Sequence, residues 1–119
     1  MESSFPDAAG RIEEYAQAAL DSLPSYLRVR MSNVEIVFED EPPLGQPLLG
    51  LYQGVPLTRR DSHYGEVLPD KITIYRGPLL RLYGQDAESL RREVRRVVLH
   101  EVAHHFGISD ERLIEIDRY

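Results

Sequence analysis

The sequence contains no cysteine and no long apolar run. The absence of cysteine excludes disulfides and thiolate metal sites, so histidine, carboxylate or carbonyl groups must hold any metal ion. No apolar segment approaches the roughly 18 residues that are needed to cross a bilayer. The N-terminal stretch also lacks the basic and apolar regions of a secretory signal, which predicts a cytoplasmic protein without a membrane partner.

Positive charge is also scarce. Lysine and arginine number 14 against 20 aspartates and glutamates, which gives a formal net charge of −6. A nucleic-acid-binding protein needs a basic surface, because its affinity comes largely from contacts with phosphates. The one basic run, RREVRR at 91–96, spreads its arginines over the outward arc of a helix and is interpreted as a solvated face. The composition therefore predicts no nucleic-acid partner.

The length of 119 residues and the mixed hydropathy patterns predict one α+β domain over residues 1–119. Its expected core is a small mixed sheet of about three strands, packed with an N-terminal helix and a long C-terminal helix. The elements are expected over residues 6–23 (helix), 33–41, 48–55 and 71–77 (strands), 78–84 (helical turn), and 86–106 and 109–119 (helices). Residues 57–69 have no periodic pattern and are predicted to form a long loop.

Local signals support these boundaries. Asp7 and Asp86 stand where the N-cap of a helix is expected. Gly107 follows the last apolar position of the long helix, where glycine commonly ends a helix in a left-handed conformation. The glycines and flanking prolines of the strand at 48–55 suit a sheet edge, because proline cannot donate a hydrogen bond to a central ladder.

The long helix separates its apolar and basic residues into two arcs. An apolar stripe runs from Leu90 to Val98 and continues into Glu101, whereas the four arginines of RREVRR occupy the opposite side. His100 and His104 are one turn apart and lie side by side at the edge of this stripe, next to Glu101. An unpartnered buried carboxylate is costly, and a metal-bound water beside Glu101 would remove that cost.

The motif HEVAHHFGISD at 100–110 contains three of the four histidines of the chain. Two imidazoles at i and i+4 bind one metal ion in an HExxH zinc helix, and the glutamate reaches the water rather than the ion. H-E-x-x-H alone arises by chance in roughly one chain in eighty of this composition. With Gly107 and Asp110 at their offsets, the chance falls to roughly one in fifteen thousand. The extended motif therefore indicates a zinc site.

A catalytic zinc usually has three protein ligands, and the two histidines leave one to be found. One route is a glutamate on a following helix. Glu115 is only eleven residues past His104, which makes this route cramped. The other route is a sharp turn directly after the helix, in which Gly107 reverses the chain and brings Asp110 back toward the metal.

The string H-E-x-x-H-x-x-G-x-x-D resembles the motif of metzincin-type zincins that use aspartate as the third ligand. With its ending HHFGISDERL, the chain resembles the small bacterial zincin-like metallopeptidase family over about residues 97–113. The resemblance implies a compact zincin-like fold with Zn²⁺ as the cofactor and His100, His104 and Asp110 as its ligands. Glu101 is then the general base.

The expected function is that of a zinc-dependent peptidase whose partner is a peptide or protein substrate, with monomer and homodimer both open. The glycine-rich segment 48–55 offers an edge strand against which an extended peptide can lie. One alternative is a non-catalytic metal-binding or protein-interaction domain, because the methionine turn of metzincins has no counterpart: the two methionines are Met1 and Met31. Another is an amidase or esterase with the same zinc chemistry.

The remaining histidines and two tyrosines receive plainer interpretations. His105 is expected to be a packed residue or a support for the ligands rather than a ligand. His63 is expected to be an ordinary surface histidine of the 57–69 loop. Tyr52 and Tyr64 are interpreted first as packing residues, with contact to a substrate carbonyl as the alternative.

Overall fold

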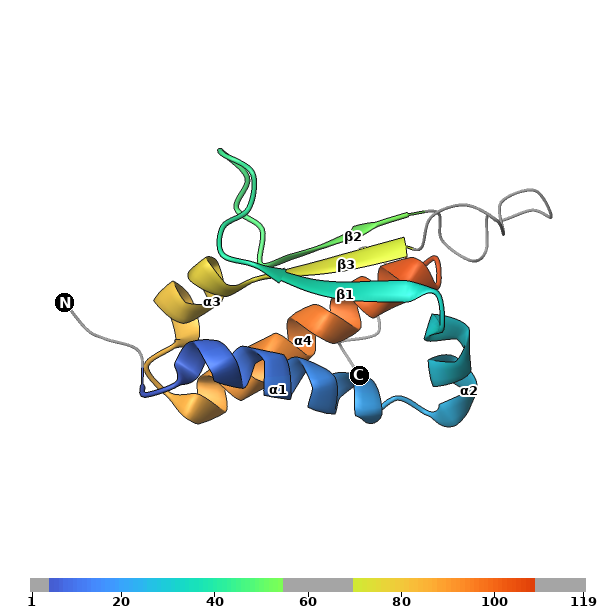
Figure 1. The fold of residues 1–119 in the computed structure, drawn as a ribbon, viewed down its shortest axis with the longest axis horizontal. Helices are drawn as coiled ribbons and strands as arrows, with labels where there is room; N and C mark the ends of the chain where they lie inside the picture. Colours follow the sequence, from blue (N-terminus) through green and yellow to red (C-terminus); the bar gives the residue numbers. More distant parts are fainter. Residues whose placement is uncertain (1–4, 55–69, 109–119) are drawn as a thin grey trace.

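The computed structural model describes residues 5–54 and 70–108, and Figure 1 shows helices gathered on one side of a small sheet. In chain order the elements are α1 (Ala8–Asp21), α2 (Ser25–Arg28), the 3-10 helix η1 (Val29–Met31), β1 (Val34–Glu39), β2 (Gly50–Gln53), β3 (Asp70–Tyr75), α3 (Arg76–Tyr83) and α4 (Ala87–His105). The predicted α+β class is confirmed.

The three strands of the described chain form one mixed sheet in the order β1-β3-β2. β1 runs parallel to the central strand β3, with Ile36 opposite Ile72. β2 runs antiparallel to β3, with Tyr52 opposite Ile72. β2 is therefore an edge strand, which confirms the position predicted from its glycines and prolines.

The central strand β3 is buried on both faces, although its sequence alternates as a half-buried strand does. Its isoleucines on one face and Thr73 and Tyr75 on the other all expose 4% or less. The prediction that this strand reaches residue 77 is wrong, because it ends at Tyr75 and α3 begins at Arg76. Pro78 explains the change, since it has no N–H for a ladder but fits the first turn of a helix.

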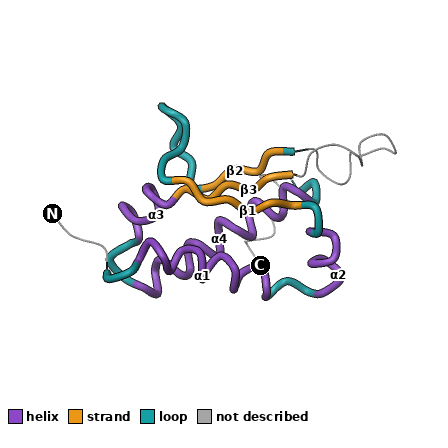
Figure 2. The backbone as a smooth tube through the Cα atoms, in the orientation of Figure 1, coloured by secondary structure: helices purple, strands orange, loops and turns teal. Residues whose placement is uncertain are grey.

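The hydrophobic core lies between the sheet and the two long helices. α1 and α4 lie side by side beneath the same face of the sheet (Figure 2). Their inward stripes recur at helical spacing, and burial of each large apolar side chain contributes roughly 1.5–3 kcal/mol. The core residues that expose 0% of their surface are Ile12, Ile72, Ile74, Leu79, Leu90, Val94 and Val98.

The two predicted N-caps have different outcomes. Asp86 caps α4 as predicted: its Oδ2 accepts a hydrogen bond from the Ser89 backbone N–H at 2.9 Å. The Ser89 side chain and backbone both donate to this carboxylate, which lowers the pKa of Asp86 below its ordinary value. The capping role predicted for Asp7 is wrong. Asp7 stands at the N-cap of α1 with a left-handed backbone, φ 61°, and its side chain makes no capping hydrogen bond.

Some elements were not predicted, and some predictions lie outside the described residues. The single turns α2 and η1 are too short to show a hydrophobic period in the sequence. The predicted loop at 57–69, with His63 and Tyr64, lies outside the described residues, as does the predicted helix at 109–119. Within residues 5–54 and 70–108, no helix is long and apolar enough to cross a membrane.

Candidate metal centre

The motif histidines face each other at the surface of α4. His100 Nε2 and His104 Nε2 lie 3.2 Å apart, with ring centroids 4.8 Å apart and ring planes at 82°. Zinc binds imidazole nitrogen at about 2.0–2.1 Å with tetrahedral angles, so two nitrogens on one zinc ion lie about 3.3 Å apart. The separation that the helix imposes on these two nitrogens therefore fits a shared zinc ion.

Glu101 lies next to this pair on the inward side of α4. It exposes 8% of its surface and continues the buried stripe formed by Val94, Val97 and Val98. The four arginines of RREVRR are exposed, but Arg96 lines the pocket that also contains His100 and Glu101. The buried stripe predicted from 100° per residue is thus confirmed, whereas the prediction that all four arginines lie opposite to it is wrong for Arg96. The stripe places Glu101 on the sheet side of the helix.

A pocket of about 220 Å³ opens beside Glu101 and His100. Residues 47–50, which lead into the edge strand β2, form one wall, and α4 forms the other with Arg96, Val97, His100 and Glu101. One candidate metal ligand and the candidate general base thus line the same concave surface as the edge strand. This arrangement gives a bound molecule access to both.

The C-terminal end of α4 makes the sharp turn that the sequence predicts. Gly107 adopts a left-handed conformation with φ 81°. Its N–H donates to His104 O at 2.9 Å, and the Ile108 N–H donates to Ala103 O at 2.9 Å. This is the hydrogen-bond pattern of a Schellman motif, which ends a helix and redirects the chain at glycine. The chain therefore changes direction three residues before Asp110.

The predicted third ligand belongs to residues outside those that the structure describes. Asp110 and the alternative Glu115 both belong to residues 109–119. Among residues 5–54 and 70–108, no group of three histidine, cysteine, aspartate or glutamate side chains is placed to hold a metal ion. The described chain thus brings together two of the three predicted ligands and the predicted base. Asp110 as the third ligand stays a prediction.

Comparison with known proteins assigns the family. The sequence profile described as zincin-like metallopeptidase matches residues 31–119, which is most of the chain. The chain belongs to the zincin-like metallopeptidase family. The matched segment includes the whole sheet, α4 and the complete motif.

A solved structure supports the fold of this zincin-like chain. A conserved hypothetical protein from Thermus thermophilus superposes with a TM-score of 0.59 and 24% sequence identity, over 82% of this chain and 92% of its own. At this identity, the likeness concerns the fold alone. A search of curated proteins finds no significant match.

Two further side chains near the site of the zincin-like chain have defined partners. His105 is buried, with 1% of its surface exposed, and its Nδ1 lies 3.0 Å from Asp70 Oδ2. The prediction that His105 is packed is confirmed. The Tyr52 hydroxyl donates a hydrogen bond of 2.6 Å to the same Asp70 oxygen.

Sequence reasoning missed Asp70, although the sequence carries a signal for it. Asp70 precedes Ile72 and Ile74 at a spacing of two, so it lies on the same face of β3 as these core residues. An acid on the apolar face of a strand needs a buried partner. A histidine on the apolar stripe of the helix, such as His105, is the natural one.

Gly50 marks the closest approach of the edge strand to α4. A Cβ added at Gly50 would lie 2.7 Å from Val97 Cγ1, 3.3 Å from Thr73 O and 3.4 Å from Glu101 Cγ. We expect Gly50→Ala to lower the free energy of unfolding by about 1–3 kcal/mol, because stiff Val97 must move or β2 must shift. Urea unfolding measures this effect.

The matched control for Gly50→Ala is Gly10→Ala. Gly10 lies on the exposed side of α1, and no atom lies within 4 Å of an added Cβ. We expect this control to raise the free energy of unfolding by roughly 0.5–1 kcal/mol, because alanine is the better helix former. A Gly50→Ala variant as stable as Gly10→Ala would show that β2 and α4 can move apart at little cost in stability.

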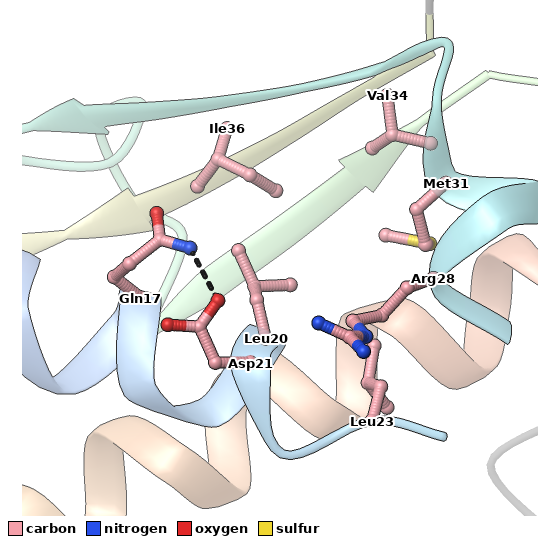
Figure 3. A pocket seen from close by; sticks show the side chains of 8 residues that line it. All are labelled: Gln17, Leu20, Asp21, Leu23, Arg28, Met31, Val34 and Ile36. Atoms are coloured by element: carbon pink, nitrogen blue, oxygen red, sulfur yellow. Dashed lines mark hydrogen bonds between the residues drawn. The ribbon is translucent and has the colours of Figure 1, made fainter. Parts of the chain in front are cut away.

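A second pocket is of a different kind. It has a volume of about 180 Å³ and lies between α1, the turn containing Met31, and β1 (Figure 3). Leu20, Leu23, Val34 and other apolar side chains line it, and a hydrogen bond of 2.9 Å from Gln17 Nε2 to Asp21 Oδ1 lies at its side. The motif residues that the structure describes are not part of its lining.

Proposed function

We propose that the chain is a zinc-dependent peptidase in which His100, His104 and Asp110 bind the metal and Glu101 is the general base. The observation that carries this proposal is the pair of imidazole nitrogens 3.2 Å apart next to a nearly buried glutamate. Membership of the zincin-like metallopeptidase family supports the same chemistry.

The proposed reaction is the addition of water to a peptide carbonyl. A zinc ion, when bound, lowers the pKa of a coordinated water toward about 7 and polarises the carbonyl of the substrate. The Glu101 carboxylate accepts a proton from the water that forms the new C–O bond. It then donates this proton to the amine that leaves when the C–N bond breaks. Burial of Glu101 on the inward side of α4 keeps the carboxylate in one place for both transfers.

The edge strand supports an extended peptide as the substrate. β2 pairs with β3 on one side only, and no other strand of the described chain pairs with its outer edge. A peptide that adds to such an edge gains backbone hydrogen bonds irrespective of its sequence. The adjacent pocket of about 220 Å³ can receive one of its side chains beside Glu101.

The test is hydrolysis of a peptide library with and without a chelator. We expect cleavage to stop after chelation and to return when Zn²⁺ is added, because the zinc-bound state carries the chemistry. Parallel assays with simple amides and esters separate a peptidase from an amidase or esterase.

Cleavage that continues in the metal-free protein would contradict the proposed mechanism. Zinc binding without hydrolysis of any of these substrates would support the alternative, a metal-binding or protein-interaction domain on the zincin scaffold.

A further inference from the structure

Among the described residues, three polar side chains form a buried network that joins the end of α4 to two strands. Asp70 Oδ2 receives the Tyr52 hydroxyl at 2.6 Å and lies 3.0 Å from His105 Nδ1. Asp70 and His105 each expose only 1% of their surface. The network therefore connects β2, β3 and α4, which come from separate parts of the sequence.

The His105 ring is held from several directions. Besides Asp70, the Tyr52 hydroxyl lies 3.3 Å from His105 Nδ1, and the Arg30 carbonyl oxygen lies 3.4 Å from His105 Nε2. The Tyr52 and His105 rings also meet edge to face, with centroids 5.7 Å apart. His105 directly follows His104 and precedes the Gly107 turn by two residues. Its contacts thus fix the helical turn that carries one metal ligand.

Stability alone is a weak reason for such a network. Removing a carboxylate and an imidazole from water is costly, and apolar side chains of the same volume would avoid this cost. Charge-assisted hydrogen bonds, however, hold their partners in one geometry, whereas apolar contacts tolerate several. The network is therefore suited to setting a position.

The position that it sets is that of the edge strand along α4. Val97, Glu101 and His105 recur every four residues and form one stripe of the helix. Gly50 meets Val97 and Glu101 on this stripe, and Tyr52, two residues later, meets His105. Four residues of a helix span about 6.0 Å along its axis, and two residues of a strand span about 6.6–6.8 Å. Contacts at every second residue of β2 therefore match contacts at every fourth residue of α4.

We propose that Tyr52, Asp70 and His105 are positioning residues for the metal centre. By fixing the last turn of α4 against the sheet, they hold the turn that carries His104 in place and set the distance of the edge strand from Glu101. The role of the edge strand rests on the proposed peptidase function. The placement of the histidine pair requires only that the chain binds a metal ion.

The test measures metal binding in the whole chain after minimal changes to the network. Tyr52→Phe removes one hydroxyl and keeps the ring, whereas Asp70→Asn keeps the shape and removes the charge. We expect the zinc dissociation constant to rise about tenfold in Tyr52→Phe and further in Asp70→Asn, in the range seen when support of ligands is lost. The visible spectrum of bound Co²⁺ should change as well, because it reports ligand geometry.

Matched controls separate positioning from general stability. Ile12 of α1 is fully buried in the core. Ile12→Val and Ile12→Ala destabilise the protein to different degrees, so their melting temperatures should lie above and below those of the network variants. We expect both controls to keep the wild-type zinc affinity and Co²⁺ spectrum. If Asp70→Asn does not fold, Tyr52→Phe carries the test.

Network variants that match the Ile12 variants in zinc affinity and spectrum overturn the positioning role. A wild-type chain that binds neither metal overturns it too. Failure of the proposed function looks different: the wild-type chain then binds zinc but cleaves nothing, while the metal measurements still decide the role of the network.

Discussion

Replacing both motif histidines with alanine is expected to abolish zinc binding. The wild-type chain should retain one zinc ion after purification and dialysis, and the His100→Ala/His104→Ala variant should retain none. The double variant removes two of the three proposed ligands, and structural zinc sites draw about 10–16 kcal/mol of apparent binding free energy from their full ligand set. Elemental analysis gives the stoichiometry, and circular dichroism shows whether the helices remain.

The fourth histidine supplies the control. His63→Ala removes an imidazole from a different part of the chain and should leave one zinc ion bound. Asp110→Ala should weaken zinc binding strongly, because it removes the proposed third ligand. Zinc retained in full by the double histidine variant would place the metal elsewhere. Since the chain has no cysteine, the ligands of such a site would be carboxylate or carbonyl groups, with or without His63 or His105.

Local signals in the sequence were sufficient for much of the fold. The strong 3.6-residue period from Leu90 to Glu101 predicted both the presence of α4 and its buried face, because periodicity over several turns leaves little ambiguity. Asp86 and Gly107 marked its ends through capping chemistry that involves only neighbouring residues. The candidate pair His100 and His104 is equally local, since helix geometry alone brings side chains four residues apart together.

Features that depend on contacts between distant segments were not predictable in the same way. The pairing of Asp70 with Tyr52 and His105 requires the register of β2 on β3 and the position of α4 beneath the sheet. The close contact of Gly50 with Val97 depends on the same packing. The sequence pattern of β3 also did not predict that both of its faces are buried, because alternation does not tell what covers a sheet.

The prediction of Asp110 as the third ligand rests on the sequence motif, because Asp110 lies outside the described residues. The Gly107 turn is present as predicted, and it redirects the chain immediately before the segment that contains Asp110. The spacing of Asp110 in the motif therefore remains the reason to prefer it over Glu115. The metal-binding measurements on Asp110→Ala address this choice directly.

Glu101→Gln is expected to abolish hydrolysis while the zinc stays bound. Glutamine has nearly the same shape but cannot accept a proton from water, and general acid–base catalysis contributes about 10²–10⁴-fold to the rate. Because the proposed ligands are His100, His104 and Asp110, the zinc content should remain one ion per chain. Turnover of a cleaved library peptide and elemental analysis of the same preparation measure the two properties together.

Glu88→Gln is the matched control, because it makes the same substitution on the same helix. Glu88 pairs with Arg91, and such exposed ion pairs contribute little to stability. This control should retain both zinc and activity, so that loss in Glu101→Gln alone identifies the general base. The decisive contrary result is loss of zinc in Glu101→Gln with zinc retained in Asp110→Ala. That outcome would exchange the two assignments, making Glu101 a ligand and Asp110 the base.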